Sequence, residues 1–221
     1  MATDNLDKYA EEIINQDKVT LKEFITAMGE KPNSSYKGQA LKEDFIIAFD
    51  TTDDKKANLL DFHVLFQTLT EMNPEYSSSS ETKSYFYRTD STTKTGTGIK
   101  IGLSGDVYYG DFVQNFLLDK KYETGNKAIV RYLLMSMKTG EGEVGFATCM
   151  VTTDRGGNVR QNATFSISLE STGGTPKKFN YDALEGGETP PEGTTPEENT
   201  VAFSAKRTTA KKESEIQWDL Y

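Results

Sequence analysis

The sequence predicts a mainly β protein of the α+β class, with a helical N-terminal extension and an extended C-terminal arm. Apolar and polar residues alternate with a period of two in several segments between residues 43 and 182, as in strands with one buried face. Apolar residues at helical spacing are confined to residues 1–42 and to one internal segment. Residues 183–221 begin with an acidic stretch rich in Pro and Gly, which predicts a linker rather than a core.

Composition and charge exclude several classes of function. The 221 residues suit one principal domain with extensions. The net charge of −9 argues against a nucleic-acid-binding protein and against docking on an anionic membrane. No apolar run approaches the ~20 residues of a bilayer span, and we expect no secretory signal. A single cysteine, Cys149, permits no intrachain disulfide, which suits a reducing compartment.

The first 42 residues predict two short helices. Residues 4–15 carry apolar side chains at helical spacing. A second helix follows Thr20, because Glu23 stands three residues later and completes a capping box. Gly29 is placed to end that helix, and residues 32–38 form a loop. The apolar stripe of the second helix comprises Leu21, Phe24, Ile25 and Met28.

Residues 43–182 predict an antiparallel sheet. Alternation indicates strands at residues 45–50, 60–67, 99–104 and 144–150, and most regularly at 159–169. In that last segment one face comprises Val159, Ala163, Phe165, Ile167 and Leu169. Residues 154–158 read as the hairpin turn that precedes it. In the strand at 144–150 one face has only small residues, including Gly145 and Cys149, so another layer can approach it closely.

One helix interrupts the strands. Asp111 is a good N-cap for a helix over residues 112–122, whose apolar face includes Phe112 and Leu117. Lys120 and Lys121 are expected in its last turn, where a positive charge suits the helix dipole. We expect this helix to pack against the sheet or against the end of the sandwich.

A long Ser/Thr-rich segment spans residues 77–98, in which twelve of twenty-two residues are Ser or Thr. It predicts either a long polar hairpin or a mobile loop with Tyr85, Phe86 and Tyr87 at its base. A loop of more than ~12–15 residues in a compact domain is usually functional or disordered. This segment is therefore the first candidate for a contact surface.

Signs of catalysis or metal binding are weak. Residues 50–61 place acidic or amide side chains at calcium-loop positions 1, 5, 9 and 12, but Lys55 stands where the loop needs Gly. His63 and Cys149 have no accompanying nucleophile motif, and Asp106 and Asp111 are explained by capping and a tight turn. We therefore expect no enzyme, no cofactor and no metal site.

The order of features across residues 43–182 is more specific. It runs through TGIKIGLSGDVYYGD, the helix FVQNFLLDKKYETGNKA, the strands IVRYLLMSM and GEVGFATCMVTT, the turn DRGGN and the strand ATFSISLESTG. The last strand carries Ala163, Phe165, Ile167, Leu169 and Gly173 in an A-x-F-x-I-x-L-x-x-x-G pattern. This order resembles the major tail proteins, or tail tube proteins, of long-tailed bacteriophages. The closest resemblance is to phages with flexible, non-contractile tails that infect Gram-positive hosts.

The resemblance implies an antiparallel β-sandwich with one flanking helix, and a structural role. Subunits are expected to form hexameric rings that stack into a hollow tube, through which DNA passes without specific binding. The expected location is the virion tail, after synthesis in the host bacterial cytoplasm. Other tail proteins are expected at the tube ends, and no membrane is involved.

Two segments are candidate arms between subunits. The first is the Ser/Thr-rich hairpin, with Ser77, Ser80, Tyr85, Tyr87, Thr92 and Lys94. The second is the apolar C-terminus, with Ile216, Trp218 and Leu220. Two other hypotheses stay open: a monomeric β-sandwich that decorates the virion or binds a host molecule, and a small β-rich hydrolase.

Overall fold

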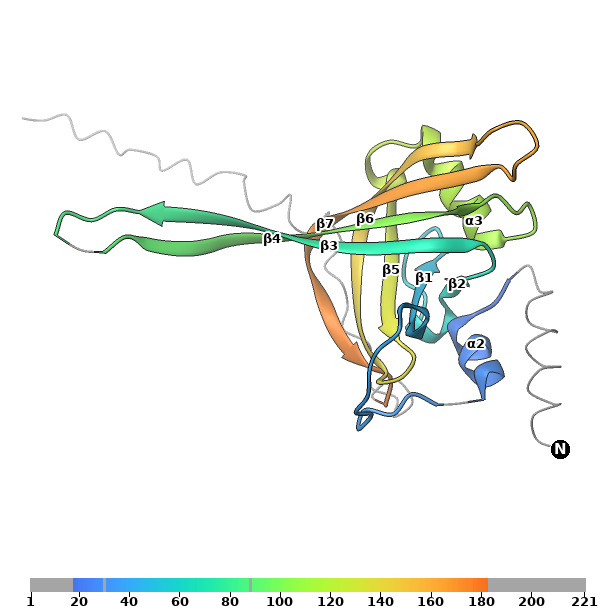
Figure 1. Ribbon diagram of the computed structural model, residues 1–221, viewed down its shortest axis with the longest axis horizontal. Coiled ribbons are helices and arrows are strands. Elements are labelled where there is room, and N and C mark those ends of the chain that lie inside the picture. The colour runs from blue at the N-terminus through green and yellow to red at the C-terminus, as the bar shows by residue number, and fades with distance from the viewer. Residues whose placement is uncertain (1–17, 30, 88, 183–221) are drawn as a thin grey trace, which may run out of the picture.

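The computed structural model describes residues 18–29, 31–87 and 89–182, so the helix predicted at 4–15 and the C-terminal segment from 183 onward lie outside the described residues. In these ranges the strands form one antiparallel sheet in the order β2-β1-β5-β6-β7-β4-β3 (Figure 1). The predicted mainly β fold is confirmed. The strands are β1 (Phe45–Asp50), β2 (His63–Leu65), β3 (Leu69–Lys83), β4 (Ser91–Asp106), β5 (Ile129–Ser136), β6 (Glu141–Gly156) and β7 (Thr164–Asn180).

The single sheet bends over on itself, so its two halves form the layers of a sandwich. One apolar cluster contains Leu65 from edge strand β2 and Met72 from the opposite edge strand β3. Figure 1 shows β3 and β4 crossing over the steeply inclined β1 and β5. Between these layers lie large buried side chains, among them Phe49, Tyr132, Ile101, Leu103, Phe165 and Ile167.

Strand β7 turns the corner between the two layers. Phe146 of β6 faces Thr172, yet Val144 faces Lys177, so β7 carries extra residues where the sheet bends. Gly174 lies in this excess segment with φ +121°, a conformation that L side chains rarely adopt. The lower half of β7 then descends along the other layer (Figure 1).

Helix α2 (Leu21–Met28) covers the outer face of β1 and β5. Its predicted capping box is present, because the Glu23 amide donates to the Thr20 hydroxyl and the Thr20 amide donates to the Glu23 carboxylate. Gly29 ends the helix with φ 68°. Leu21 and Ile25 are buried in a second cluster with Ala48 and other residues, whereas Met28 at the end of the predicted stripe is exposed.

Helix α3 (Phe112–Asp119) packs against the core between the layers, as predicted. The Asp111 carboxylate accepts from the Gln114 amide at 2.9 Å, so Asp111 is the N-cap. The small side chain of Cys149 permits close approach, and its Sγ lies 3.7 Å from the Leu117 carbonyl oxygen. Lys120 and Lys121 lie in a following 3-10 turn, Lys120–Tyr122, rather than in the last turn of the helix.

Two predicted strands are shorter than the alternation indicates. The segment at 60–67 keeps only β2, because Leu59–Asp61 forms a 3-10 turn whose Leu59 is buried in the second cluster. The segment at 159–169 becomes strand only from Thr164. Val159 is 93% exposed and Arg160 has φ 75°, so residues 157–163 form the loop between β6 and β7.

Candidate assembly interface

The outer part of the β3–β4 hairpin projects from the sheet as a two-stranded ribbon, here called the arm (residues 77–98). Strand β4 pairs with β7 only from Lys100 to Asp106, and beyond that stretch it pairs with β3 alone. Figure 1 shows the arm extending well past the body. At about 3.3 Å per residue, the pairs from Ser77 to Lys83 carry the ribbon roughly 20 Å outward before the turn.

The predicted polar residues of the arm lie on its paired strands. Ser77 stands opposite Gly98, and Ser80 opposite Lys94. The hydroxyl groups of Thr82 and Thr92 lie 2.9 Å apart across the ribbon. Because residues 77–83 pair with residues 91–98 across two strands, the structure has the hairpin rather than the loop of the two predicted alternatives. The side chains of these polar residues are exposed.

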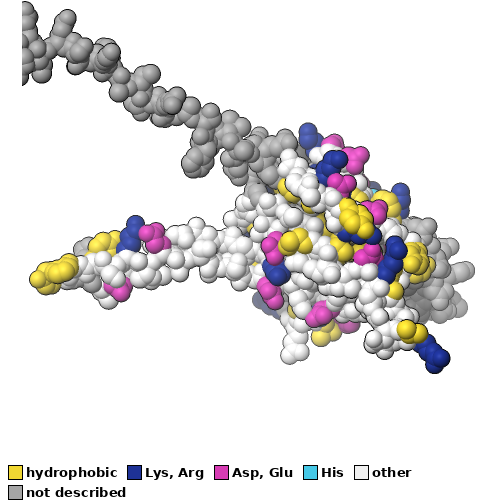
Figure 2. Space-filling model, turned by 90° about the horizontal axis from the view of Figure 1, so that it is seen from above, with side chains coloured by type: hydrophobic (Ala, Val, Ile, Leu, Met, Phe, Trp, Pro, Cys, Tyr) yellow, Lys and Arg dark blue, Asp and Glu magenta, His cyan; other side chains and the backbone are white. Residues whose placement is uncertain are grey.

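The aromatic residues of the arm are at its tip, and their predicted position at its base is wrong. The last cross-strand pair is Lys83 with Ser91, which leaves Tyr85, Phe86 and Tyr87 in the turn. Phe86 is 90% exposed and Tyr87 is 96% exposed, and their rings touch edge to face with centroids 5.0 Å apart. Figure 2 shows this hydrophobic cluster at the far end of an otherwise polar arm. Phe86, which sequence reasoning left out of the candidate set, belongs to the tip.

The arm has little support from its own body. The β3 side chains from Glu75 to Lys83 are all exposed, so the arm buries no apolar side chain there. An isolated two-stranded hairpin is marginally stable in water at best. Strand β3 also forms one edge of the sheet. Both features favour contacts with another chain.

Two side-chain hydrogen bonds fix the base of the arm to the sheet. The Tyr76 hydroxyl donates to Glu143 Oε1 of β6 at 3.0 Å, and the Ile99 amide donates to Ser171 Oγ of β7 at 3.0 Å. Tyr76 is 69% exposed as a whole, but partial desolvation, and then the charge of Glu143 and its hydrogen bond, raise the pKa of Tyr76 to about 12. The hydroxyl therefore stays protonated and able to donate at neutral pH.

A buried glutamine fixes the other end of the same hairpin. Gln114 Nε2 donates to Thr68 Oγ1 at 2.8 Å and to the Asp106 carbonyl at 2.9 Å, while its Oε1 accepts from the Tyr108 amide at 2.8 Å. Thr68 immediately precedes β3, and Asp106 ends β4. Helix α3 is thereby tied to both strands that carry the arm.

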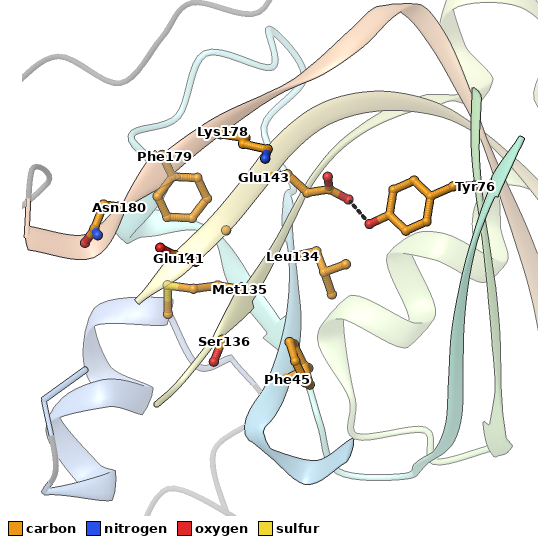
Figure 3. A pocket seen from close by; sticks show the side chains of 11 residues that line it. Phe45, Tyr76, Leu134, Met135, Ser136, Glu141, Glu143, Lys178, Phe179 and Asn180 are labelled. Atoms are coloured by element: carbon orange, nitrogen blue, oxygen red, sulfur yellow. Dashed lines mark hydrogen bonds between the residues drawn. The ribbon is translucent and has the colours of Figure 1, made fainter. Parts of the chain in front are cut away.

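Beneath the arm base lies a groove with a volume of about 540 Å³, here called the groove (Figure 3). Its apolar lining includes Phe45, Leu134 and Phe179, and Glu143 reaches across it to Tyr76. Phe179 lies directly over Gly142, where a Cβ would stand 2.6 Å from the ring. Sequence reasoning missed the groove, because its lining comes from β1, β3, β5, β6 and β7.

In the calcium-loop-like segment, residues 50–61, Asp50 makes structural contacts within the protein. Asp50 Oδ2 lies 3.7 Å from Arg131 Nη1 and accepts from the Ala57 amide at 3.0 Å. Arg131 also donates to the Lys55 and Ala57 carbonyl groups. Across residues 18–29, 31–87 and 89–182 no group of three or more His, Cys, Asp or Glu side chains could hold a metal ion.

The other candidate chemical residues are dispersed. His63 Nδ1 lies 3.0 Å from the Thr51 hydroxyl, and burial, followed by the charge of Lys18, lowers the pKa of His63. Burial raises the pKa of the Cys149 thiol to about 12, so at neutral pH it remains a thiol. Asp106 accepts from Asn162 while Asp111 caps α3, so these two carboxylates serve separate structural contacts.

No helix in the described part of the chain is long and apolar enough to cross a membrane. The candidate terminal arm with Ile216, Trp218 and Leu220 lies outside the described residues.

Comparison with known proteins gives structural likenesses only. No family model matches the chain, and no curated protein matches it. A chain of the SPP1 tail tube is similar, with a TM-score of 0.49 and 12% identity, over 64% of this chain and 80% of that one. A chain of the native gene transfer agent virion has a TM-score of 0.48 and 11% identity, over 64% and 99% of the two chains. A chain of the tube-terminating cap of the anti-feeding prophage has a TM-score of 0.45 and 8% identity, over 66% and 94%.

Proposed function

We propose that this protein is a structural subunit that polymerises into stacked hexameric rings and forms a phage tail tube, the conduit for DNA ejection. The observation that carries the proposal is the arm, a ribbon with exposed aromatic side chains at its tip and no apolar packing on its own body. A partner that covers this ribbon supplies the burial that the free chain lacks. The hexameric rings, their stacking and the DNA conduit are taken from the sequence resemblance to tail tube proteins.

The surface composition fits a conduit. The net charge of −9 disfavours association with the phosphate backbone, so DNA passes without being held. The candidate chemical residues His63, Cys149 and Asp50 are engaged in structural contacts, which fits a mechanical role. In this proposal the protein is located in the virion tail.

The test is electron microscopy of concentrated purified protein by negative stain. Tubes or rings with a central hole are the expected result. Dispersed single particles at every concentration contradict the proposal and favour the alternative, a monomeric virion-decoration or host-binding module. Classification of end-on views gives the ring symmetry and tests the six-fold arrangement directly.

An arm-deleted variant provides the matched control. Ser77 and Gly98 face each other, so residues 78–97 can be replaced by Asn-Gly, which favours the two-residue turn of a tight hairpin. We expect the melting temperature to stay near that of the parent, because the removed segment buries no large apolar side chain on the body. We also expect tubes to be lost. Regular tubes from this variant contradict the role of the arm.

A further inference from the structure

We infer that the groove is the receptor for the arm tip of a second copy of this chain, which places Phe86 and its neighbours beside Phe45, Leu134 and Phe179 of the next subunit. This inference rests on the proposed function and deepens it by naming the site at which the arm docks. The molecule carries an exposed aromatic cluster and an open apolar groove on one chain, and neither is covered by the described residues.

The shape of the arm excludes docking within one chain. Tyr76 lines the groove, and Tyr85 lies nine residues further along the same extended hairpin. At about 3.3 Å per residue, these residues are roughly 30 Å apart. The hydrogen bond from Tyr76 to Glu143 holds the arm base in place, so the tip of a chain points away from its own groove. The tip can therefore fill only the groove of another copy.

The groove is preformed for an aromatic side chain. Its apolar rim is accessible, since Phe45 is 41% exposed. Its volume of about 540 Å³ accommodates an aromatic ring without rearrangement of the sheet. Gly142 has no side chain to fill the groove, and a larger residue there would collide with Phe179 and with the Leu134 carbonyl oxygen.

Charge complementarity favours the same pairing. The charged residues lining the groove are Glu141, Glu143 and Lys178, with a net charge of −1. The arm carries three basic and two acidic residues, with a net charge of +1, although the whole chain carries −9. The arm is thus a locally basic segment that can approach an acidic groove on an acidic protein.

The contact joins two different patches of the same chain. Such a heterologous contact closes into a ring when the rotation between copies closes, and otherwise leaves a free tip and a free groove for further growth. Where the arm reaches a copy in the next layer, growth continues along the arms, as a stacked structure requires. A symmetric dimer, in which both partners use the same patch, would close and stop.

The test is site-directed cross-linking between copies of the full-length protein. Phe86→Cys protein is mixed with Phe45→Cys protein at more than ten times the concentration at which the parent forms tubes, which offsets the loss of the Phe86 ring. The mixture is treated with a short bismaleimide, while tube formation is followed by electron microscopy. Cys149 is buried and burial raises its pKa to about 12, so we expect the native thiol not to react with the maleimide. Treatment of the unsubstituted protein is the control for this. The matched control pairs Phe86→Cys with Val159→Cys, which is 93% exposed and lies in the loop between β6 and β7. Melting curves verify that each variant is folded.

The expected result is a cross-linked dimer from the Phe86–Phe45 mixture at least five-fold more abundant than from the control mixture. Tubes without this preference leave the proposed function standing and overturn the docking site. Absence of both tubes and cross-links overturns both. Cross-linking with this preference but without tubes supports the docking site and contradicts the tube. A third mixture tests another occupant: if Trp218→Cys cross-links to Phe45→Cys in place of Phe86→Cys, the C-terminal segment fills the groove and the inference is wrong.

Discussion

The Tyr76 hydroxyl donates a 3.0 Å hydrogen bond to Glu143 Oε1 and joins the base of the arm to strand β6. These residues are 67 positions apart in the sequence and belong to opposite layers of the bent sheet. The bond therefore couples the direction of the arm to the layer that forms the groove.

This contact predicts a loss of stability in alkaline solution. The pKa of Tyr76 is raised from 10 to about 12, so the folded protein retains its proton at a pH where the unfolded chain releases it. The contribution of Tyr76 is complete below pH 10 and is lost as the pH rises toward 12. The expected difference spectrum between parent and Tyr76→Phe shows one tyrosine that titrates late. Glu143→Gln removes the charge and should make Tyr76 titrate earlier, and an unchanged titration contradicts the contact.

Gln114 predicts a large cost for a single buried substitution. Its side chain makes three hydrogen bonds, and the residue is fully buried. Gln114→Leu leaves the Tyr108 amide, the Asp106 carbonyl and the Thr68 hydroxyl without this partner, which should lower the free energy of unfolding by about 2–4 kcal/mol. Urea denaturation measures the change. The control is Asn115→Ala, which removes one exposed hydrogen bond to Tyr109 and should cost less than about 1 kcal/mol.

The buried ion pair between Asp50 and Arg131 predicts a second strong effect. Both side chains are nearly inaccessible, with exposed fractions of 0% and 8%. Asp50→Asn removes the carboxylate charge from beside the buried guanidinium, and we expect a loss of about 3 kcal/mol in the free energy of unfolding. Lys100→Ala breaks a pair with Glu170 that is more than half exposed, and it should change stability by less than about 1 kcal/mol. Equal effects for the two variants would show that the ion pair is not buried in solution.

The capping box of α2 predicts a smaller, local effect. The Thr20 hydroxyl satisfies the Glu23 amide, and the Glu23 carboxylate satisfies the Thr20 amide. Thr20→Ala removes one half of this exchange and should cost about 1 kcal/mol. Thr20→Ser keeps the hydroxyl and should restore most of the loss. Failure of Ser to do so would contradict a capping role.

Local signals in the sequence predicted local structure well. Asp111 and Thr20 stand directly before apolar residues at helical spacing, and both are N-caps in the structure. Ile99, Ile101 and Leu103 alternate with small or polar residues, and all three are buried. These features depend on neighbours within four residues, so the sequence displays them directly.

Features that depend on distant pairing could not be predicted in the same way. The position of Tyr85–Tyr87 at the tip follows from the register of β3 against β4, including the irregularity at Ser79 and Ser80. The groove needs the bend in β7 near Gly174, which brings Phe179 into the same groove as Phe45. The alternation at residues 60–67 predicted too long a strand. A 3-10 turn also buries apolar side chains that are two or three positions apart, here Leu59 and Phe62.

The exposed aromatic residues at the arm tip predict a separation of stability from assembly. Phe86 and Tyr87 are 90% and 96% exposed, so replacing both with Ser removes almost no packing from the folded monomer. We expect a melting temperature unchanged within about 2 °C, because surface substitutions of this kind change stability by less than about 0.5 kcal/mol. We expect tube formation to require at least ten-fold more protein, since the lost side chains are those that a neighbour buries.

Tyr122→Ser is the matched control, because Tyr122 is 86% exposed but lies beside α3, away from the arm. It should leave both the melting temperature and the assembly threshold unchanged. Sedimentation at a series of protein concentrations measures the threshold for each variant. If Tyr122→Ser impairs assembly as strongly as the double substitution at the tip, general surface hydrophobicity drives association, and the tip has no special role.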